Sequence, residues 1–200
     1  MIMKKFILLL LIAGMSGSFF NLAAQRVTGI SYRNRNLFGA GMTLISYRYE
    51  YAGSRSIGFP ATTAYMEMGL MDNITAGPYV GYARWNYDTE LDNQTWNYTW
   101  SFTNAGVRGS LHLTRVLNNV LNMDINENRT DWYVTLIAGL EYRQYTSTST
   151  EFIDRFDNEY NFLIGPLVGV RYYLGSSLGF YFEAGRGNLG LFTAGISLRL

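Results

Sequence analysis

The strongest constraint on the fold of this chain is an alternation of apolar and polar side chains, which recurs in runs of about ten residues. The run GLFTAGISLRL, Gly190 to Leu200, shows it clearly. Successive side chains of a strand point to opposite faces, so this run predicts a strand with one apolar face. One parity holds Phe192, Ala194, Ile196, Leu198 and Leu200, and the other holds Thr193, Gly195, Ser197 and Arg199.

Eight runs of this kind follow one another along the chain. Their lengths exceed the average strand of soluble proteins, about 5–6 residues, and match a tilted strand that crosses a membrane, about 9–11 residues. The eight predicted strands are residues 39–51, 61–71, 74–87, 98–113, 131–145, 159–174, 178–186 and 191–200.

The connections between these runs alternate in length. MDN (71–73) and GSS (175–177) are short, whereas residues 88–97 and 146–158 are longer, acidic and polar. Short turns at one end and longer loops at the other are typical of barrels in bacterial outer membranes. Residues 114–130 break this pattern. The helical spacing of their apolar residues predicts a short amphipathic helix or an extended turn there.

The charged side chains of each run share a face with its glycines, and the opposite face is almost wholly apolar. A soluble sandwich with an apolar core would also alternate. Three features favour a membrane barrel with the apolar face outward. The charged face is sparse, no strand carries the lysines that protect soluble edge strands, and aromatic residues gather at strand ends as an interfacial girdle. These aromatic residues are Tyr47, Tyr49, Tyr51, Trp85, Tyr87, Trp100, Trp132 and Tyr142.

A sheet in hydrocarbon must have no open edge, because each unpaired backbone group there costs several kcal/mol. The last run must therefore pair with the first. The sequence predicts an all-β fold, a closed up-and-down antiparallel transmembrane β-barrel of about eight strands, as one domain over residues 39–200.

The first 24 residues have two lysines, an apolar core and a small-residue end, which predicts a secretory signal peptide cut after Ala24. Residues 25–38 then form a short periplasmic segment. Without the signal the chain has no lysine, 14 arginines and 15 acidic residues, a net charge of 14 − 15 = −1. Such a balance gives no field that attracts nucleic acid. The chain also contains no cysteine.

The block IGPLVGVRYYLGSSLGFYFEAGRG (164–187) and the ending GISLRL resemble the small outer-membrane β-barrel proteins of Gram-negative bacteria, the OmpA/OmpX-like class. The resemblance covers most of residues 39–200 and the signal. It implies export to the outer membrane and contact with its lipid. It also implies a C-terminal strand read by the barrel-assembly machinery, with Leu200 in place of the more usual phenylalanine. We expect a monomer.

Eight strands leave an interior that side chains just fill. We therefore predict a packed ionic core, in which arginine and carboxylate side chains pair across the lumen. The alternative is a narrow conduction path lined by arginine. The residues placed inward by parity are Arg48, Glu67, Arg84, Arg108, Glu141, Arg143, Arg171, Glu183 and Arg199.

The sequence predicts no catalytic, cofactor or metal site. His112 is the only histidine, and Ser110 lies two residues before it, but no acid is placed beside them by sequence. We interpret His112 as a polar residue near a turn. GRGNLG (185–190) lacks the helix that follows a phosphate loop, so it predicts a hairpin.

The longer loops carry apolar residues among acidic ones, which suits an extracellular partner. These residues are Trp96, Phe152, Ile153 and Phe156. The sequence thus predicts a non-catalytic outer-membrane barrel with an envelope-structural or surface-interaction, adhesion-like role. The first alternative is a small pore or transport-accessory barrel. The second is a soluble periplasmic, lipocalin-like binder.

Overall fold

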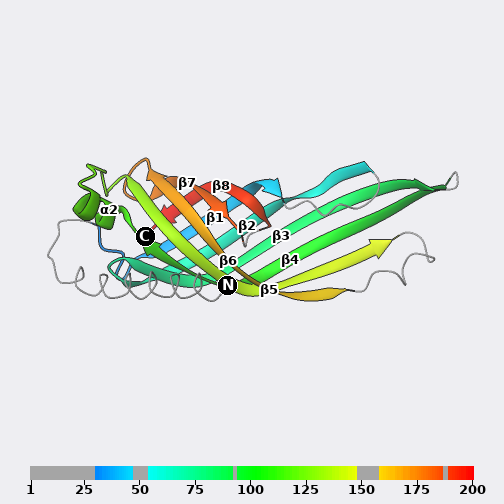
Figure 1. The fold of residues 1–200 in the computed structure, drawn as a ribbon, viewed down its shortest axis with the longest axis horizontal. Coiled ribbons are helices and arrows are strands. Elements are labelled where there is room, and N and C mark those ends of the chain that lie inside the picture. The colour runs from blue at the N-terminus through cyan, green and yellow to red at the C-terminus, as the bar shows by residue number, and fades with distance from the viewer. Residues whose placement is uncertain (1–29, 47–53, 92–93, 148–157, 187–188) are drawn as a thin grey trace, which may run out of the picture.

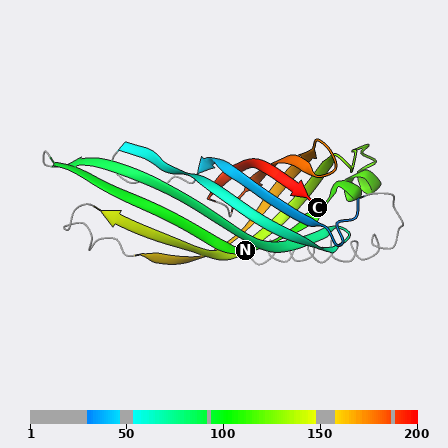
Figure 2. The same ribbon diagram turned by 180° about the vertical axis from the view of Figure 1, so that it is seen from behind.

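The computed structural model describes residues 30–46, 54–91, 94–147, 158–186 and 189–200. The predicted signal peptide lies outside these residues. Eight antiparallel strands follow one another around a closed barrel in chain order (Figures 1 and 2). The strands are β1 (Asn36–Ser46), β2 (Ser54–Met71), β3 (Ile74–Leu91), β4 (Gln94–His112), β5 (Thr130–Ser147), β6 (Glu159–Tyr173), β7 (Leu178–Gly185) and β8 (Gly190–Arg199).

The last strand closes the barrel against the first, as the sequence predicts. Leu37 pairs with Arg199 and Ala40 with Ile196, and the register runs on to Ser46 and Gly190 with two irregularities. The ends of these strands are tied further, because Asn36 and Leu200 exchange both backbone hydrogen bonds, each at 2.9 Å. No edge therefore remains at this seam, which satisfies the backbone in an apolar surrounding.

The apolar faces of the strands point outward, and this confirms the orientation predicted from the alternation. The exposed apolar side chains form a belt around the barrel, whereas a soluble protein would bury such residues. Polar and charged side chains point inward. Members of the belt on seven strands are Met68, Val80, Val107, Leu136, Leu140, Ile164, Val168, Phe180 and Ile196.

The two ends of the barrel differ. The turn end carries the short connections β2–β3 and β6–β7, the C-terminus and the helix α2 (Thr114–Leu121), and the hairpin end lies opposite (Figure 1). The helix prediction for residues 114–130 is confirmed. Among the described residues, no helix is long and apolar enough to cross a membrane.

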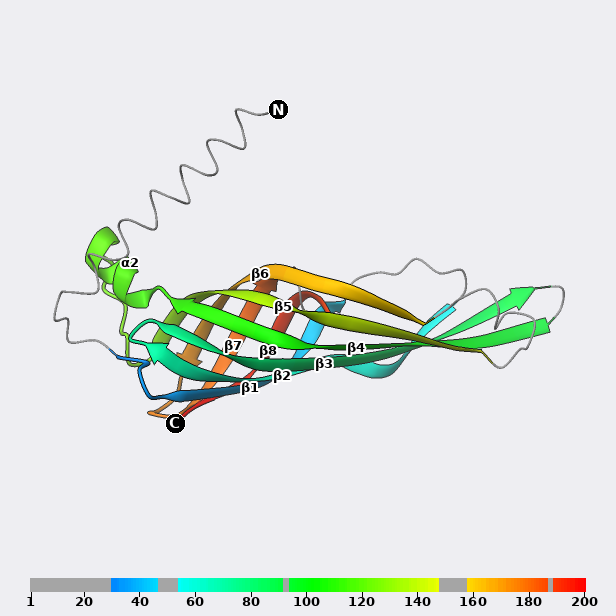
Figure 3. The ribbon, with the colours of Figure 1, turned by 90° about the horizontal axis from the view of Figure 1, so that it is seen from below.

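The strands differ strongly in length, so the barrel wall is tall on one side and short on the other (Figure 3). Strands β2 to β5 have 18 or 19 residues, whereas β7, β8 and β1 have 8, 10 and 11. The strand ends differ from the prediction accordingly. β1 begins three residues earlier than expected, and it ends within the described residues at Ser46.

The structure corrects the prediction of a loop at residues 88–97. β3 and β4 continue as a paired hairpin from Trp85↔Trp100 to Leu91↔Gln94. The polar composition of this segment suggested a loop, but its threonine and aromatic residues are also good strand formers. The other predicted loop, 146–158, lies mostly outside the described residues.

The predicted aromatic girdle is wrong at three positions. Trp85, Tyr87 and Trp100 point inward and pack with Phe102 in a buried cluster in the hairpin half of the barrel. The ring centroids of Trp85 and Phe102 lie 4.9 Å apart. Trp132 does point outward. Tyr47, Tyr49 and Tyr51 lie outside the described residues.

Candidate functional site

The turn half of the barrel encloses a network of buried charges centred on Glu67. This β2 carboxylate is completely buried and accepts three short hydrogen bonds. Its donors are Arg108 Nε at 2.5 Å, Thr75 Oγ1 at 2.6 Å and Ser110 Oγ at 2.7 Å. Thr75 lies on the adjacent strand β3, whereas Arg108 and Ser110 lie on β4, the second strand along.

Arg108 joins Glu67 to a second carboxylate across the lumen. Its Nη2 donates to Glu183 Oε1 on β7 at 2.6 Å, and the Tyr133 hydroxyl donates to the same oxygen at 2.9 Å. The guanidinium also lies over the Tyr65 ring, 3.8 Å from its centroid. Arg108 therefore bridges β2 and β7, which are not neighbours in the sheet.

Arg171 on β6 makes the corresponding connection to β5. Its Nη1 donates to Asp131 Oδ2 at 2.9 Å, and its Nη2 lies 3.7 Å from Glu67 Oε2. The Tyr133 ring covers the guanidinium at 3.8 Å, and the Tyr65 hydroxyl accepts from its Nε at 3.3 Å and from its Nη2 at 3.2 Å. Both buried arginines are thus paired with carboxylates and covered by aromatic rings.

His112 completes the network through both of its ring nitrogens. Its Nδ1 lies 2.9 Å from Asp131 Oδ1, and its Nε2 lies 3.1 Å from Thr75 Oγ1. The Thr75 hydroxyl in turn donates to Glu67, so the histidine ring joins Asp131 to the Glu67 side of the network.

Arg108 and Arg171 together contact all three carboxylates of this network. A buried charge without a partner is costly, so these ion pairs allow the charged side chains to be buried. The network that we call the ionic core comprises Glu67, Arg108, His112, Asp131, Arg171 and Glu183.

The connectivity Thr75–His112–Asp131 is that of a nucleophile, a base and an orienting acid. The geometry does not support that chemistry here. Thr75 is completely buried, and its hydroxyl donates to Glu67 at 2.6 Å. This hydroxyl is therefore not placed where a substrate could reach it.

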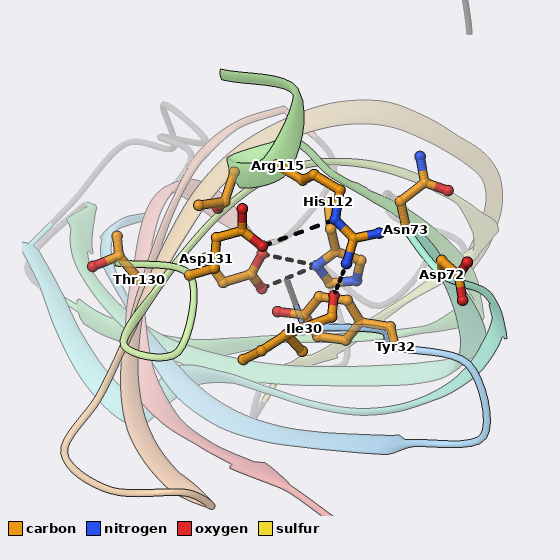
Figure 4. A pocket seen from close by; sticks show the side chains of 10 residues that line it. Ile30, Tyr32, Asp72, Asn73, His112, Arg115, Thr130 and Asp131 are labelled. Atoms are coloured by element: carbon orange, nitrogen blue, oxygen red, sulfur yellow. Dashed lines mark hydrogen bonds and ion pairs between the residues drawn. The ribbon is translucent and has the colours of Figure 1, made fainter. Parts of the chain in front are cut away.

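The N-terminal segment covers this network at the turn end (Figure 4). The Tyr32 ring stacks on the His112 ring, with centroids 3.6 Å apart and planes at 12°. Arg115 Nη2 donates to the Ile30 carbonyl at 2.9 Å. Burial, with a smaller contribution from Asp131, raises the pKa of Tyr32 well above its usual value. The small pocket beside Tyr32 is partly open to solvent.

Four of the sequence-predicted residues, Glu67, Arg108, Arg171 and Glu183, meet in the ionic core. Arg199 points inward separately at the turn end, where its guanidinium lies 3.9 Å from the centroid of the Tyr173 ring.

Glu141 and Arg143 form another pair nearer the hairpin end. Arg143 Nε donates to Glu141 Oε1 at 2.7 Å, and Arg143 Nη1 lies 3.8 Å from Glu159 Oε2. The inward charges therefore form separate groups at different heights.

The prediction for Arg84 is wrong. Its neighbours Ala83 and Trp85 point inward, so the Arg84 side chain is exposed on the outer face of β3. The assignment fails because Arg84 has the parity opposite to that of Ala83 and Trp85, which pack in the buried cluster of the lumen. Arg48 lies outside the described residues.

Sequence reasoning did not place His112 or Asp131 in the core. A signal was present, since His112 shares its parity with Arg108 on β4, and Asp131 shares its parity with Tyr133 on β5. Parity does not give the register between β4 and β5, so it could not show that the two side chains lie at the same position along the barrel axis. Within the described residues, no group of three or more His, Cys, Asp or Glu side chains could hold a metal ion.

No protein-family model matches this sequence, and no curated protein matches it. Among solved structures, the outer-membrane protein OprG of Pseudomonas aeruginosa aligns over 87% of this chain and 99% of its own, with a TM-score of 0.51 and 7% identity. The N-terminal β-barrel domain of OprF from the same organism aligns over 84% and 96%, with a TM-score of 0.42 and 13% identity.

Ail, the attachment invasion locus protein of Yersinia pestis, aligns over 84% of this chain and 99% of its own, with a TM-score of 0.43 and 8% identity. At such identities a likeness shows the fold alone. The match to OprG confirms that this chain has the fold of the small eight-stranded outer-membrane barrels.

Proposed function

We propose that this chain is a non-catalytic protein of the bacterial outer membrane that binds a partner at the cell surface. The observation that carries the proposal is the unequal height of the barrel wall (Figure 3). β4 has 19 residues, about eight more than a tilted strand needs to cross a bilayer. Eight residues at about 3.3 Å each, tilted by about 40°, reach about 20 Å beyond the membrane.

The part of β2 to β6 at the hairpin end, which we call the raised sheet, has open edges in the described part of the chain. Among the described residues, β1 pairs with β2 from Thr62 to Met68, and β7 pairs with β6 from Leu167 to Tyr173. One further backbone bond joins Arg186 N to the Pro166 carbonyl at 3.1 Å. Beyond these contacts, no described strand pairs with the outer side of β2 or β6. Such edges can accept an extended segment of another protein as an added strand.

Prolines lie where both free edges begin. Pro60 precedes the first β1–β2 pair, and Pro166 precedes the first β6–β7 pair. Proline within sheets is confined to edges and bulges, and it limits uncontrolled pairing between molecules. The edges therefore carry a feature that favours selective over indiscriminate strand addition.

The ionic core argues against the pore alternative. Its side chains connect β2, β4, β5, β6 and β7 across the lumen, and Tyr32 covers it at the turn end. A conduction path would have to break several buried ion pairs, and breaking one typically costs about 3–5 kcal/mol. The exposed apolar belt argues against the soluble binder, because it would lie in water.

Orientation follows from the two ends. Short turns face the periplasm and long connections face outward in barrels of this fold, so the raised sheet extends from the cell. The predicted signal peptide, residues 1–24, supports export, and the closing strand β8 supports insertion by the barrel-assembly machinery. We expect the barrel to act as a monomer, surrounded by outer-membrane lipid.

The experiment shortens the raised sheet without changing the barrel. Residues 89–96 are replaced by Asn-Gly, because Asp88 and Asn97 are register partners and this turn suits a two-residue hairpin. Cells that express the natural or shortened chain are tested for attachment to cultured epithelial cells and to immobilised extracellular-matrix proteins. Heat-modifiable migration on gels checks that both barrels fold.

We expect the natural chain to raise attachment above that of vector-only cells and the shortened chain to lose this gain. Equal attachment by both chains would contradict the role of the raised sheet. Stable, large conductance in planar bilayers would instead support the pore. Extraction from the envelope by salt without detergent would support the soluble binder.

A further inference from the structure

The helix α2 has two distinct faces, although it is only eight residues long. At 100° per residue, its polar side chains fall on one side and its apolar side chains on the other. The polar face holds Thr114, Arg115, Asn118 and Asn119, and the apolar face holds Val116, Leu117, Val120 and Leu121.

The polar face is fastened to the barrel and to its own connection. Arg115 donates to the Ile30 carbonyl, and the Thr114 hydroxyl accepts from the Trp132 backbone at 2.7 Å. The Asn118 amide exchanges hydrogen bonds with both backbone groups of Ile125, each at 2.9 Å. These contacts fix the rotation of the helix about its axis.

The C-terminal part of the apolar face points away from the protein. Val120 is 58% exposed and Leu121 is 62% exposed, and Met123, just beyond the helix, is 45% exposed. Val116 and Leu117 are half-buried. A helix on a soluble domain turns its apolar side to the core and its polar side to water. The exposed apolar side chains at the end of α2 therefore favour an apolar medium beside it.

The apolar belt of the barrel leads directly to this helix. β4 ends beside Leu113, whose backbone donates to the Trp132 carbonyl at 2.6 Å, and α2 starts at the next residue. Trp132 points outward from β5 and is 40% exposed. Tryptophan is typical of the boundary between lipid and water. The helix lies at the turn end of the barrel (Figure 3), and its first residue bonds to the backbone of this tryptophan.

We propose that α2 is an interfacial helix, whose apolar face lies in the lipid leaflet at the turn end of the barrel. The inference rests on the membrane location given under the proposed function. A helix of eight residues is about 12 Å long, enough to lie along the leaflet beside the strands. Its partner is phospholipid, with acyl chains against Val120 and Leu121 and water at Asn119.

This placement also gives α2 a structural effect on the mouth of the barrel. The face opposite the lipid holds the Ile30 carbonyl through Arg115, and the same N-terminal segment stacks Tyr32 on His112. Lipid contact at the apolar face of α2 therefore helps to keep the N-terminal segment, with Tyr32, over the ionic core.

The test uses the absence of cysteine from the chain, which allows one spin label at a time. Val120→Cys reports the apolar face, Asn119→Cys is the matched control on the polar face, and Leu136→Cys is the reference in the belt. The full chain is folded into phosphatidylcholine nanodiscs, and folding is checked by heat-modifiable migration. Collision with oxygen and with a water-soluble nickel chelate then measures the surroundings of each label.

We expect the Val120 label to be oxygen-accessible and nickel-shielded, about 5–10 Å into the boundary between headgroups and acyl chains. The Asn119 label should be nickel-accessible. If the labels at Val120 and Asn119 are equally nickel-accessible while that at Leu136 is in lipid, the helix inference is wrong and the membrane location stands. A Val120 label shielded from both reagents indicates a protein partner and also overturns it. A nickel-accessible label at Leu136 overturns both proposals.

Discussion

Replacing Glu67 by glutamine tests whether the ionic core stabilises the barrel through its paired charges. The change keeps the size of the side chain and removes one negative charge. Arg108 and Arg171 then lose a carboxylate that they face in this buried site. The new amide nitrogen takes the place of Oε2, so the Thr75 hydroxyl loses the acceptor of its 2.6 Å hydrogen bond.

The expected loss follows from these contacts. Removal of one partner from a buried ion pair costs about 3–5 kcal/mol, and a hydrogen bond to a charged group contributes about 1.5–3 kcal/mol. The two effects overlap, because the same carboxylate serves both. We therefore expect Glu67→Gln to lower the free energy of unfolding by about 3–5 kcal/mol.

The assay is equilibrium unfolding by urea in phospholipid vesicles, followed by tryptophan fluorescence and by heat-modifiable migration. Glu159→Gln is the control, because this carboxylate is 62% exposed and lies 3.8 Å from Arg143. Such a pair contributes at most about 1 kcal/mol. Equal effects of the two variants would refute the reasoning.

A double variant distinguishes the loss of an ion pair from the loss of packing. In Glu67→Gln with Arg108→Met, one negative and one positive charge are removed together, so the net charge of the core is unchanged. We expect this double variant to be less destabilised than the sum of the two single changes, with an interaction energy of up to about 3 kcal/mol. Strict additivity would mean that Glu67 and Arg108 do not act as a pair.

Two further predictions use the same unfolding assay. Leu136→Arg places a charge on the exposed apolar belt and should cost about 2–4 kcal/mol, whereas no loss would place this residue outside lipid. Gly169→Ala should cost about 1–3 kcal/mol, because its new Cβ would lie 2.3 Å from the buried Tyr133 ring. Gly109→Ala has its nearest atom at 3.9 Å and should be tolerated, so equal losses at the two glycines would contradict the packing argument.

The period-two alternation of the sequence determined the number of strands, their order and which face of most strands points outward. This was possible because side-chain direction in a strand depends only on parity, which is local. Glu67, Arg108, Arg171 and Glu183 were placed inside the barrel on this basis alone. The amphipathic spacing of residues 114–130 likewise predicted α2.

The tertiary structure alone decided the position of each residue along the barrel axis and which residues meet across the lumen. Parity gives a face but no height, so the pairing of His112 with Asp131 and the link from Arg108 to Glu183 depend on the stagger between strands. The Arg84 prediction is wrong for a different reason, because Arg84 has the parity opposite to that of Ala83 and Trp85, whose side chains point inward. Strand length beyond the membrane was also undecided, because a polar hairpin and a polar loop have similar composition until register pairs them.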